Sequence, residues 1–310
     1  MTIEIEKLEQ YFGSRLQRNI KLSAYTTSRV GGEAGCFIVS NSAEELAADV
    51  HFLWDNDIPM QVLGSGANVL VSDQGIDKVI LLNKAKAFSF ETLGDQFLVN
   101  VESGATLSVV AREAAQRGFD GLVWASTVPG TVGGAVYGNA GAHGGDMSRS
   151  LIMAEILHRE KGRLSLNAEQ MEYAYRSSVI KRSPGMAVIL SAKLALRPGN
   201  PDEIKAVVQA NIEKRRLSQP SGACFGSTFK NPAGDSAGRL IEAAGLKGTR
   251  IGGVQISPVH ANFLINDGTG TAEDYRRLVL LVKQTVFDKF GVKLELEIEM
   301  IGKWQDVNND

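Results

Sequence analysis

The stretch from Pro129 to Gly145 is the feature that most constrains what this chain can fold into. Seven of its seventeen residues are glycine. Because glycine has no Cβ, so dense a run disfavours a regular helix or strand. It favours a loop whose backbone amides face a large, flat, charged ligand. A glycine-rich surface linker is the alternative, but Val132, Val136 and Tyr137 are too apolar for a solvated linker.

A second glycine loop lies earlier in the chain. The sequence predicts a short strand at residues 60–63 that opens into Gly-Ser-Gly-Ala-Asn-Val-Leu at residues 64–70. Such a loop can present amides and small polar side chains to a pyrophosphate. It is not a dinucleotide-binding fingerprint, because no glycine follows three residues after Gly66 and the loop continues as a strand. A hairpin turn explains this loop equally well by itself, but two such loops in one chain favour a ligand.

Length, charge and cysteine content exclude several classes of protein. The 310 residues suffice for about two domains. A net charge of −2 supplies no general basic field for nucleic acid. No apolar run approaches the roughly 18 residues of a membrane span, and the first ten residues lack the apolar core of a signal peptide. We therefore expect a cytoplasmic protein in which Cys36 and Cys224 are free thiols.

Hydrophobic periodicity predicts a mixed α and β pattern over the first two-thirds of the chain. One helix is expected from Ser42, which forms a capping box with Glu45, to about Asn56. Another is expected to follow Thr106 and to close at Gly118. Strands are expected at residues 36–39, 60–63, 69–71, 79–82, 97–101, 151–159, 163–166 and 186–196.

The Pro-Gly-Asn-Pro run at residues 198–201 is the clearest break, and a more helical unit is expected after it. Helices are predicted at residues 202–217 and 237–244, and a third is opened by Thr271 and stopped by Gly291. The cationic residues 214–216 end the first of these helices, and dipole complementation and anion binding explain them equally well. Residues 292–300 alternate strictly, which predicts a strand with three carboxylates on one face.

The residues themselves point to ligand binding more clearly than to a reaction. No histidine lies near Ser227 as a base, so a serine hydrolase is disfavoured. The four histidines and two cysteines are scattered, so we predict no metal site. The carboxylates of the last strand form a solvated face, or one of them is turned toward a site. The sequence therefore predicts an α/β protein that binds a phosphate-bearing ligand through two glycine loops.

Six motifs, in order along the chain, carry a resemblance to a known family. They are Gly-Ser-Gly-Ala-Asn-Val-Leu (64–70), Pro-Gly-Thr-Val-Gly-Gly-Ala (129–135), Asn-Ala-Gly-Ala (139–142), Tyr-Arg-Ser-Ser (175–178), Gly-Ser-Thr-Phe-Lys-Asn-Pro (226–232) and Glu-Leu-Glu-Ile-Glu-Met-Ile-Gly (295–302). From about Tyr25 to Gly302 the chain resembles the UDP-N-acetylenolpyruvoylglucosamine reductases, which are flavoenzymes of peptidoglycan precursor synthesis.

The resemblance implies a fold and a domain organisation. The fold class is α+β, with an FAD-binding domain of the vanillyl-alcohol-oxidase type and a smaller α/β substrate-binding domain. We place the FAD-binding region at residues 1–197, with two subdomains at about 1–83 and 84–197. The substrate-binding domain is expected at residues 198–310.

The resemblance also implies an activity, that of an FAD-dependent UDP-N-acetylmuramate dehydrogenase. NADPH as co-substrate reduces non-covalently bound FAD, and the enolpyruvyl ether of UDP-N-acetylglucosamine then binds in the same cleft. Flavin N5 passes hydride to the methylene carbon, the adjacent carbon becomes an enolate-like anion, and the product is UDP-N-acetylmuramate. Such an enzyme serves cell wall biogenesis, cell shape and cell division from the cytoplasm. We expect a monomer without a nucleic-acid or membrane partner.

Site residues carry over from the family motifs. Arg176 and Glu297 are expected to hold and polarise the substrate carboxylate, and Ser227 is expected to donate the proton. A cation suits a position where negative charge develops. The residues expected at FAD are Gly64, Ser65, Gly66, Ala67, Asn68, Val69, Pro129, Gly130, Thr131, Gly133, Gly134, Asn139, Ala140 and Gly141. Those expected near the substrate are Tyr175, Arg216, Asn231 and Lys247.

The chain departs from the family pattern at two places. The tyrosine-bearing insertion that one subgroup carries after the Tyr-Arg segment is absent, which leaves open which groups bind the UDP pyrophosphate. Glu299 stands where many relatives have a basic residue. Two other functions compete with a reductase. An oxygen-using flavin oxidase of the same fold would form hydrogen peroxide, whereas a catalytically idle nucleotide-binding module would give Arg176, Ser227 and Glu297 no reason to coexist.

Overall fold

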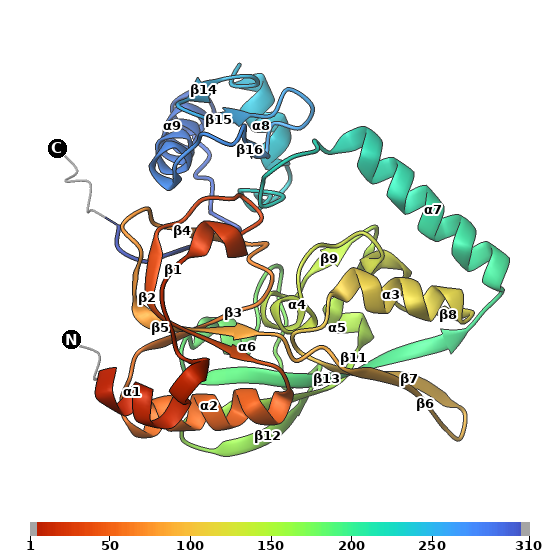
Figure 1. Ribbon diagram of the computed structural model, residues 1–310. Helices are drawn as coiled ribbons and strands as arrows, with labels where there is room; N and C mark the ends of the chain where they lie inside the picture. Colours follow the sequence, from red (N-terminus) through yellow and green to blue (C-terminus); the bar gives the residue numbers. More distant parts are fainter. Residues whose placement is uncertain (1–4, 305–310) are drawn as a thin grey trace. The chain divides into compact units, whose positions relative to one another are not determined.

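The computed structural model describes residues 5–304, which form two compact units (Figure 1). The first unit contains residues 5–16, 37–65 and 79–215. The second contains residues 17–36, 66–78 and 216–304. This grouping assigns two N-terminal segments to the C-terminal unit and divides the later chain at 215/216. The sequence-based division at 197/198, between an FAD-binding domain and a substrate-binding domain, stays a prediction.

An antiparallel sheet forms the centre of the first unit. Its strand order is β12-β11-β13-β7-β6, and β8 pairs with an end of β13. The strands are β6 (Phe88–Leu93), β7 (Gln96–Glu102), β8 (Phe119–Asp120), β11 (Leu151–His158), β12 (Gly162–Asn167) and β13 (Ala187–Pro198). The strands predicted at residues 151–159 and 163–166 are confirmed as β11 and β12, which pair antiparallel, while β6 was not expected.

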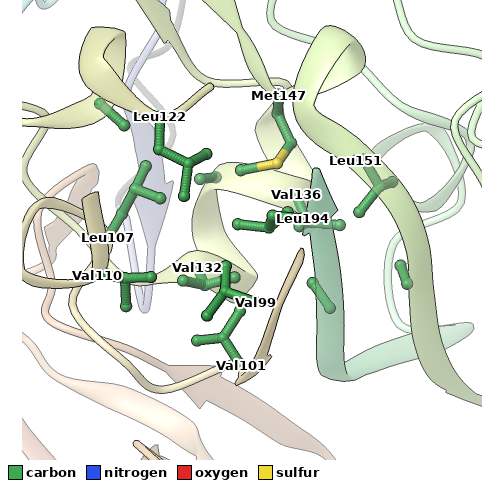
Figure 2. Close-up of a cluster of buried hydrophobic side chains, with 14 of the residues drawn as sticks. Val99, Val101, Leu107, Val110, Leu122, Val132, Val136, Met147, Leu151 and Leu194 are labelled. Atoms are coloured by element: carbon green, nitrogen blue, oxygen red, sulfur yellow. The ribbon is translucent and has the colours of Figure 1, made fainter. Parts of the chain in front are cut away.

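Two helices provide the apolar partners of this sheet. They are α3 (Leu107–Gln116) and α4 (Val132–Gly138). Figure 2 shows Val99 and Val101 of β7 in one buried cluster with Leu107, Val110 and Val132 of the helices. Burying a Val or Leu side chain stabilises a fold by about 1.5–3 kcal/mol. This cluster therefore fixes the start of α4, and with it the central glycine stretch, against the sheet.

A second sheet has the order β1-β2-β5-β3, in which β3 and β5 pair in parallel. Its strands are β1 (Gln17–Lys21), β2 (Glu33–Ser40), β3 (Met60–Leu63) and β5 (Ile76–Asn83). Strands β2 and β5 each contain residues of both units. The connection from β2 to β3 is α2 (Ala43–Asp55), and the Ser42 side chain accepts from the Glu45 amide as predicted.

The second unit is built on a long helix and short strands. Helix α9 (Ala272–Phe290) begins after Thr271 and ends at Gly291, as predicted; Thr271 and Asp274 form a capping box, and the φ of Gly291 is 68°. The remaining elements are α8 (Ala237–Ala243), an antiparallel sheet of β14 (Arg250–Ile251), β15 (Val254–Ile256) and β16 (Leu264–Asn266), and a parallel pair of β4 (Val69–Val71) and β17 (Glu299–Ile301). Buried residues of α9, such as Tyr275 and Leu278, form the core with α8 and β15.

The other helices, turns and strands complete the described chain. They are α1 (Ile5–Phe12), the 3₁₀ turns Gly13–Arg15, Leu22–Tyr25 and Val123–Ala125, β9 (Gly141–Ala142), β10 (Gly145–Asp146), α5 (Met147–Ser150), α6 (Val179–Arg182) and α7 (Pro201–Ser218). Among the described residues no helix combines the length and the apolar character that crossing a bilayer would require.

Two expectations about elements were wrong. The central glycine stretch is not wholly irregular, because it contains α4. Residues 292–300 do not form one strand: only 299–301 do, although Leu294 and Ile298 are buried as the alternation predicts. The helix predicted at residues 202–217 is confirmed as α7, and on its apolar face Ile204 is buried, Val208 and Ile212 are half-buried and Val207 is exposed. The amphipathic spacing predicted α7, but it did not predict how much of the apolar face of α7 other residues would cover.

Candidate active site

Within the first unit the two glycine loops meet at Gly64 and Thr131. A Cβ built on Gly64 would lie 2.7 Å from Thr131 Oγ1. The same Thr131 oxygen caps α4 by accepting from the Gly134 amide at 3.3 Å. A Cβ on Gly133 would lie 2.9 Å from Ser103 Cβ, and the Gly133 amide donates to the Ser103 carbonyl. Glycine is thus required at both positions, because the Gly64 backbone packs against the Thr131 side chain and the Gly133 backbone packs against Ser103.

The Tyr-Arg-Ser-Ser segment and the preceding Ala174 are attached to the central glycine stretch by three hydrogen bonds. Asn139 Nδ2 donates to the Ala174 carbonyl at 3.0 Å, and Ser178 Oγ donates to the Tyr137 carbonyl at 2.7 Å. Arg176 Nη2 donates to the Gly141 carbonyl at 3.4 Å. The structure therefore brings Arg176 to the stretch expected at FAD, although the two lie far apart in sequence.

The local geometry of Arg176 is unusual. Its backbone has a φ of 55°, a left-handed conformation that a non-glycine residue adopts at a cost. Its guanidinium lies 5.1 Å from the ring centroid of Tyr175. Tyr175 itself is 52% exposed. A strained, ring-stacked cation beside a glycine loop is a candidate for recognising an anionic group.

The predicted FAD residues divide into two kinds. Ser65, Pro129 and Gly134 are exposed, and a Cβ on Gly138 would meet nothing within 4 Å. These positions leave open backbone edges of the kind a flat, phosphate-bearing cofactor needs. Asn139 is instead buried, and both ends of its amide bond to protein, because its Oδ1 also accepts from the Ser148 amide. The described residues of the two loops thus fit FAD, with Asn139 acting as their internal support.

In the second unit, the later part of the glycine loop at residues 64–70 pairs with the C-terminal strand. Gly66 has a φ of 64°, and a Cβ there would lie 2.0 Å from the Tyr25 carbonyl oxygen. Asn68 Nδ2 donates to the Glu297 carbonyl at 3.0 Å, and the Glu299 amide donates to the Asn68 carbonyl at 2.9 Å. The parallel β4–β17 pair continues this contact. The position of the Glu297 backbone is therefore fixed by the glycine loop at residues 64–70.

Ser227 and Glu297 are brought together by their neighbours' backbones. The Glu297 amide donates to the Thr228 carbonyl at 2.9 Å, and Phe229 bridges Leu296 in antiparallel fashion. Ser227 is half-buried and follows Gly226, whose φ is 98°. The proposed proton donor and one of the proposed carboxylate-holding residues thus share one backbone-paired element in the second unit.

The candidate substrate residues have varied environments. Lys247 Nζ lies 2.7 Å from Glu242 Oε1, and Asn231 Oδ1 accepts from the Ala237 amide at 3.1 Å. Arg216 lies in the exposed last turn of α7. Among residues 5–304, no cluster of three or more His, Cys, Asp and Glu side chains could hold a metal ion.

Comparisons with known proteins define the class and then the family. A model of the FAD binding domain matches residues 34–165, so the chain contains an FAD-binding domain. Together with the reductase relatives described below, this domain makes the chain an FAD-dependent oxidoreductase. A model of the UDP-N-acetylenolpyruvoylglucosamine reductase C-terminal domain matches residues 218–301. The chain belongs to the UDP-N-acetylenolpyruvoylglucosamine reductase family.

Individual relatives cover nearly the whole chain. The reductase of Anoxybacillus flavithermus is 39% identical over 303 residues, which are 96% of this chain and 98% of the relative. That of Bacillus subtilis is 38% identical over 300 residues, with shares of 96% and 98%. The crystal structure of the Thermus caldophilus reductase matches with a TM-score of 0.75 and 32% identity, and it covers 93% of this chain and 99% of that one. The family expected from the six motifs is thereby confirmed.

Proposed function

We propose that this chain reduces the enolpyruvyl group of UDP-N-acetylglucosamine enolpyruvate with NADPH and forms UDP-N-acetylmuramate. Family membership over 96% of the chain supports the reaction. The observation that carries the proposal here is that two of the three predicted catalytic residues, Arg176 and Glu297, are each bonded to a predicted cofactor loop. Arg176 bonds to Gly141, and the Glu297 carbonyl bonds to Asn68.

Each residue is assigned one task. Bound FAD supplies the hydride chemistry, which no protein side chain provides. The Ser227 hydroxyl donates a proton to the substrate carbon that becomes basic, and a neutral hydroxyl suffices because a carbanion is far more basic than an alkoxide. Arg176 and Glu297 hold and polarise the substrate carboxylate, where preorganised charge stabilises the anion that develops. Tyr175, Arg216, Asn231 and Lys247 are assigned to substrate binding.

The cellular setting and the domain roles belong to the same proposal. The product is a peptidoglycan precursor, so the enzyme serves cell wall biogenesis, cell shape and cell division. It acts in the cytoplasm as a monomer and without a nucleic-acid or membrane partner, in keeping with its net charge of −2. Residues 1–197 bind FAD and residues 198–310 bind the substrate.

The test uses the purified, flavin-loaded protein. It should absorb in the visible range, and acid precipitation should release all of the chromophore because the FAD is non-covalent. Anaerobic NADPH should bleach the flavin. Flavin that stays in the precipitate would refute the non-covalent assignment. Folded protein that binds no flavin would favour an idle module, and stoichiometric hydrogen peroxide with oxygen as acceptor would favour an oxidase.

A further inference from the structure

Asn262 is a buried asparagine that contacts the two residues following Ser227. Its carbonyl accepts from the Thr228 amide at 2.8 Å. Its side chain makes two more hydrogen bonds, since Oδ1 accepts from the Phe229 amide at 2.9 Å and Nδ2 donates to the Phe229 carbonyl at 2.8 Å. Only 2% of Asn262 is exposed, so water does not compete for these groups.

The turn that carries Asn262 is fixed by its own hydrogen bonds. Ser257 is fully buried, and its Oγ accepts from the Val259 and His260 amides at 3.0 and 3.2 Å. The Asn262 amide donates to His260 Nδ1 at 3.2 Å, and the Phe263 amide donates to the His260 carbonyl at 3.0 Å. The position of Asn262 is therefore fixed by the hydrogen-bonded turn between β15 and β16.

These contacts hold the Ser227 segment from one side while Glu297 holds it from the other. The Thr228 amide bonds to Asn262, and the Thr228 carbonyl bonds to the Glu297 amide. Both backbone polar groups of Thr228, the residue that follows Ser227, are therefore hydrogen-bonded. Gly226, on the other side of Ser227, has a positive φ and open space around its Cα. The direction of the Ser227 side chain thus depends mainly on the fixed segment after it.

We propose that Asn262 is a positioning residue for proton transfer, acting through the Thr228–Phe229 backbone to aim the Ser227 hydroxyl. The inference rests on the proposed function of Ser227. A misplacement of about 1 Å at a reacting group costs roughly a hundredfold in rate. Asn262 touches the backbone of the two residues after the proton donor and acts on Ser227 only through that backbone. Its loss should therefore impair the step that uses Ser227 and spare the step that does not.

The experiment measures the two half-reactions of the flavin-loaded Asn262→Ala variant by anaerobic stopped flow. Flavin reduction by NADPH should stay within twofold of the wild-type rate. Reoxidation by the enolpyruvyl substrate should slow at least tenfold. Because Asn262 acts through Ser227, adding Asn262→Ala to Ser227→Ala should slow reoxidation no further. Hydrogen exchange of the peptide amides at residues 225–231 should become faster, while exchange in α9 should not change.

A matched control separates positioning from general stability. Asn266 is another buried asparagine of the same unit, and its side chain bonds to the Ser28 carbonyl and to the Gly268 and Gly270 amides. Asn266→Ala should also lower the thermal midpoint, but reoxidation should stay within twofold of wild type. If Asn262→Ala does not fold, Asn262→Asp, which keeps the shape and the acceptor for the Phe229 amide, is measured in the same double-variant comparison.

Several results would overturn the inference. They are a normal reoxidation rate in the Asn262 variant, equal slowing of both half-reactions, losses that multiply with those of Ser227→Ala, and an equal loss in Asn266→Ala. Failure of the proposed function has a different signature. In that case the wild-type flavin would itself not be reoxidised by the enolpyruvyl substrate.

Discussion

At the scale of single residues, Arg176 joins local strain to a chemical role. Its left-handed backbone and its contact with the Gly141 carbonyl fix the guanidinium beside the glycine stretch. Strain of this kind persists only where the surroundings determine the conformation, and it gathers at functional sites. The Tyr-Arg-Ser-Ser motif indicated this arginine, but its proximity to Gly141 could not be read from the sequence.

We predict that Arg176→Ala loses turnover while the flavin spectrum stays intact. Arg176→Lys should also be poor, because an ammonium cannot reproduce the planar fork of a guanidinium. Steady-state turnover with NADPH and the enolpyruvyl substrate, together with the visible spectrum of each variant, checks both statements. Near-normal turnover in Arg176→Lys would contradict the role in holding a carboxylate.

His260 supplies a prediction about pH. Burial lowers the pKa of this imidazole, and the nearby Lys247 lowers that pKa further, whereas Glu242 raises it. Its Nδ1 accepts from the Asn262 amide, which requires the neutral ring. The unfolded chain takes up a proton as the pH falls below about 6.5, while the folded state resists it. This group's contribution to stability is therefore complete above about pH 6.5 and is lost as the pH falls toward the lower folded pKa.

We therefore expect the free energy of unfolding to decline between pH 7 and pH 5, and to decline less in His260→Gln. Urea unfolding across this range measures the difference between the two proteins. His143, whose pKa burial also lowers, is unchanged in both proteins and cancels in the comparison. An identical pH dependence in wild type and variant would show that the His260 imidazole is not held neutral by the fold.

At the scale of elements, α4 shows why a glycine-rich segment forms a helix. The dense glycines suggested a loop, yet Thr131 caps the first turn and Val132, Ala135 and Val136 are buried. Tertiary burial overrides the weak helix propensity of glycine. The glycines remain necessary where the backbone packs closely, as at Gly133 against Ser103.

Two neighbouring glycines of α4 should respond differently to alanine. A Cβ at Gly133 would lie 2.9 Å from Ser103 Cβ, so Gly133→Ala should destabilise the flavin-free protein by about 1–3 kcal/mol through overpacking. A Cβ at Gly134 would have Thr131 Oγ1 as its nearest neighbour at 3.5 Å, an ordinary contact. Gly134→Ala should therefore be neutral or stabilising by up to about 1 kcal/mol. Urea unfolding of the two apoproteins checks this, and equal effects would disprove the packing argument.

At the scale of the whole molecule, local signals predicted elements well and long-range pairings poorly. The capping box and the final glycine placed α9, and the Ser42 cap placed α2, because both depend on residues within a few positions of each other. The parallel pairing of β4 with β17 joins residues 69–71 to residues 299–301, and no local sequence pattern encodes a pairing over such a separation.

The candidate site shows the same division. The motifs identified Ser227 and Glu297 as a candidate pair, but only the structure shows that Glu297 bonds to the residue after Ser227. Asn262 was missed, because a single asparagine in an apolar run carries no signal until its burial and its partners are known. The candidate catalytic residues could thus be predicted from the sequence motifs, whereas the hydrogen bonds that hold their backbones could not.

The central claim is that this chain passes reducing equivalents from NADPH to an enolpyruvyl ether with Ser227 as proton donor. The most direct test reduces the flavin anaerobically, adds the enolpyruvyl substrate and follows the flavin absorbance. We predict rapid reoxidation with formation of UDP-N-acetylmuramate by wild type. In Ser227→Ala, NADPH should reduce the flavin at a near-normal rate, and reoxidation should be slower by the ~10²–10⁴ typical of a positioned general acid. Wild-type flavin that the substrate leaves reduced would contradict the reaction, and equal slowing of both half-reactions in Ser227→Ala would contradict the role of the serine.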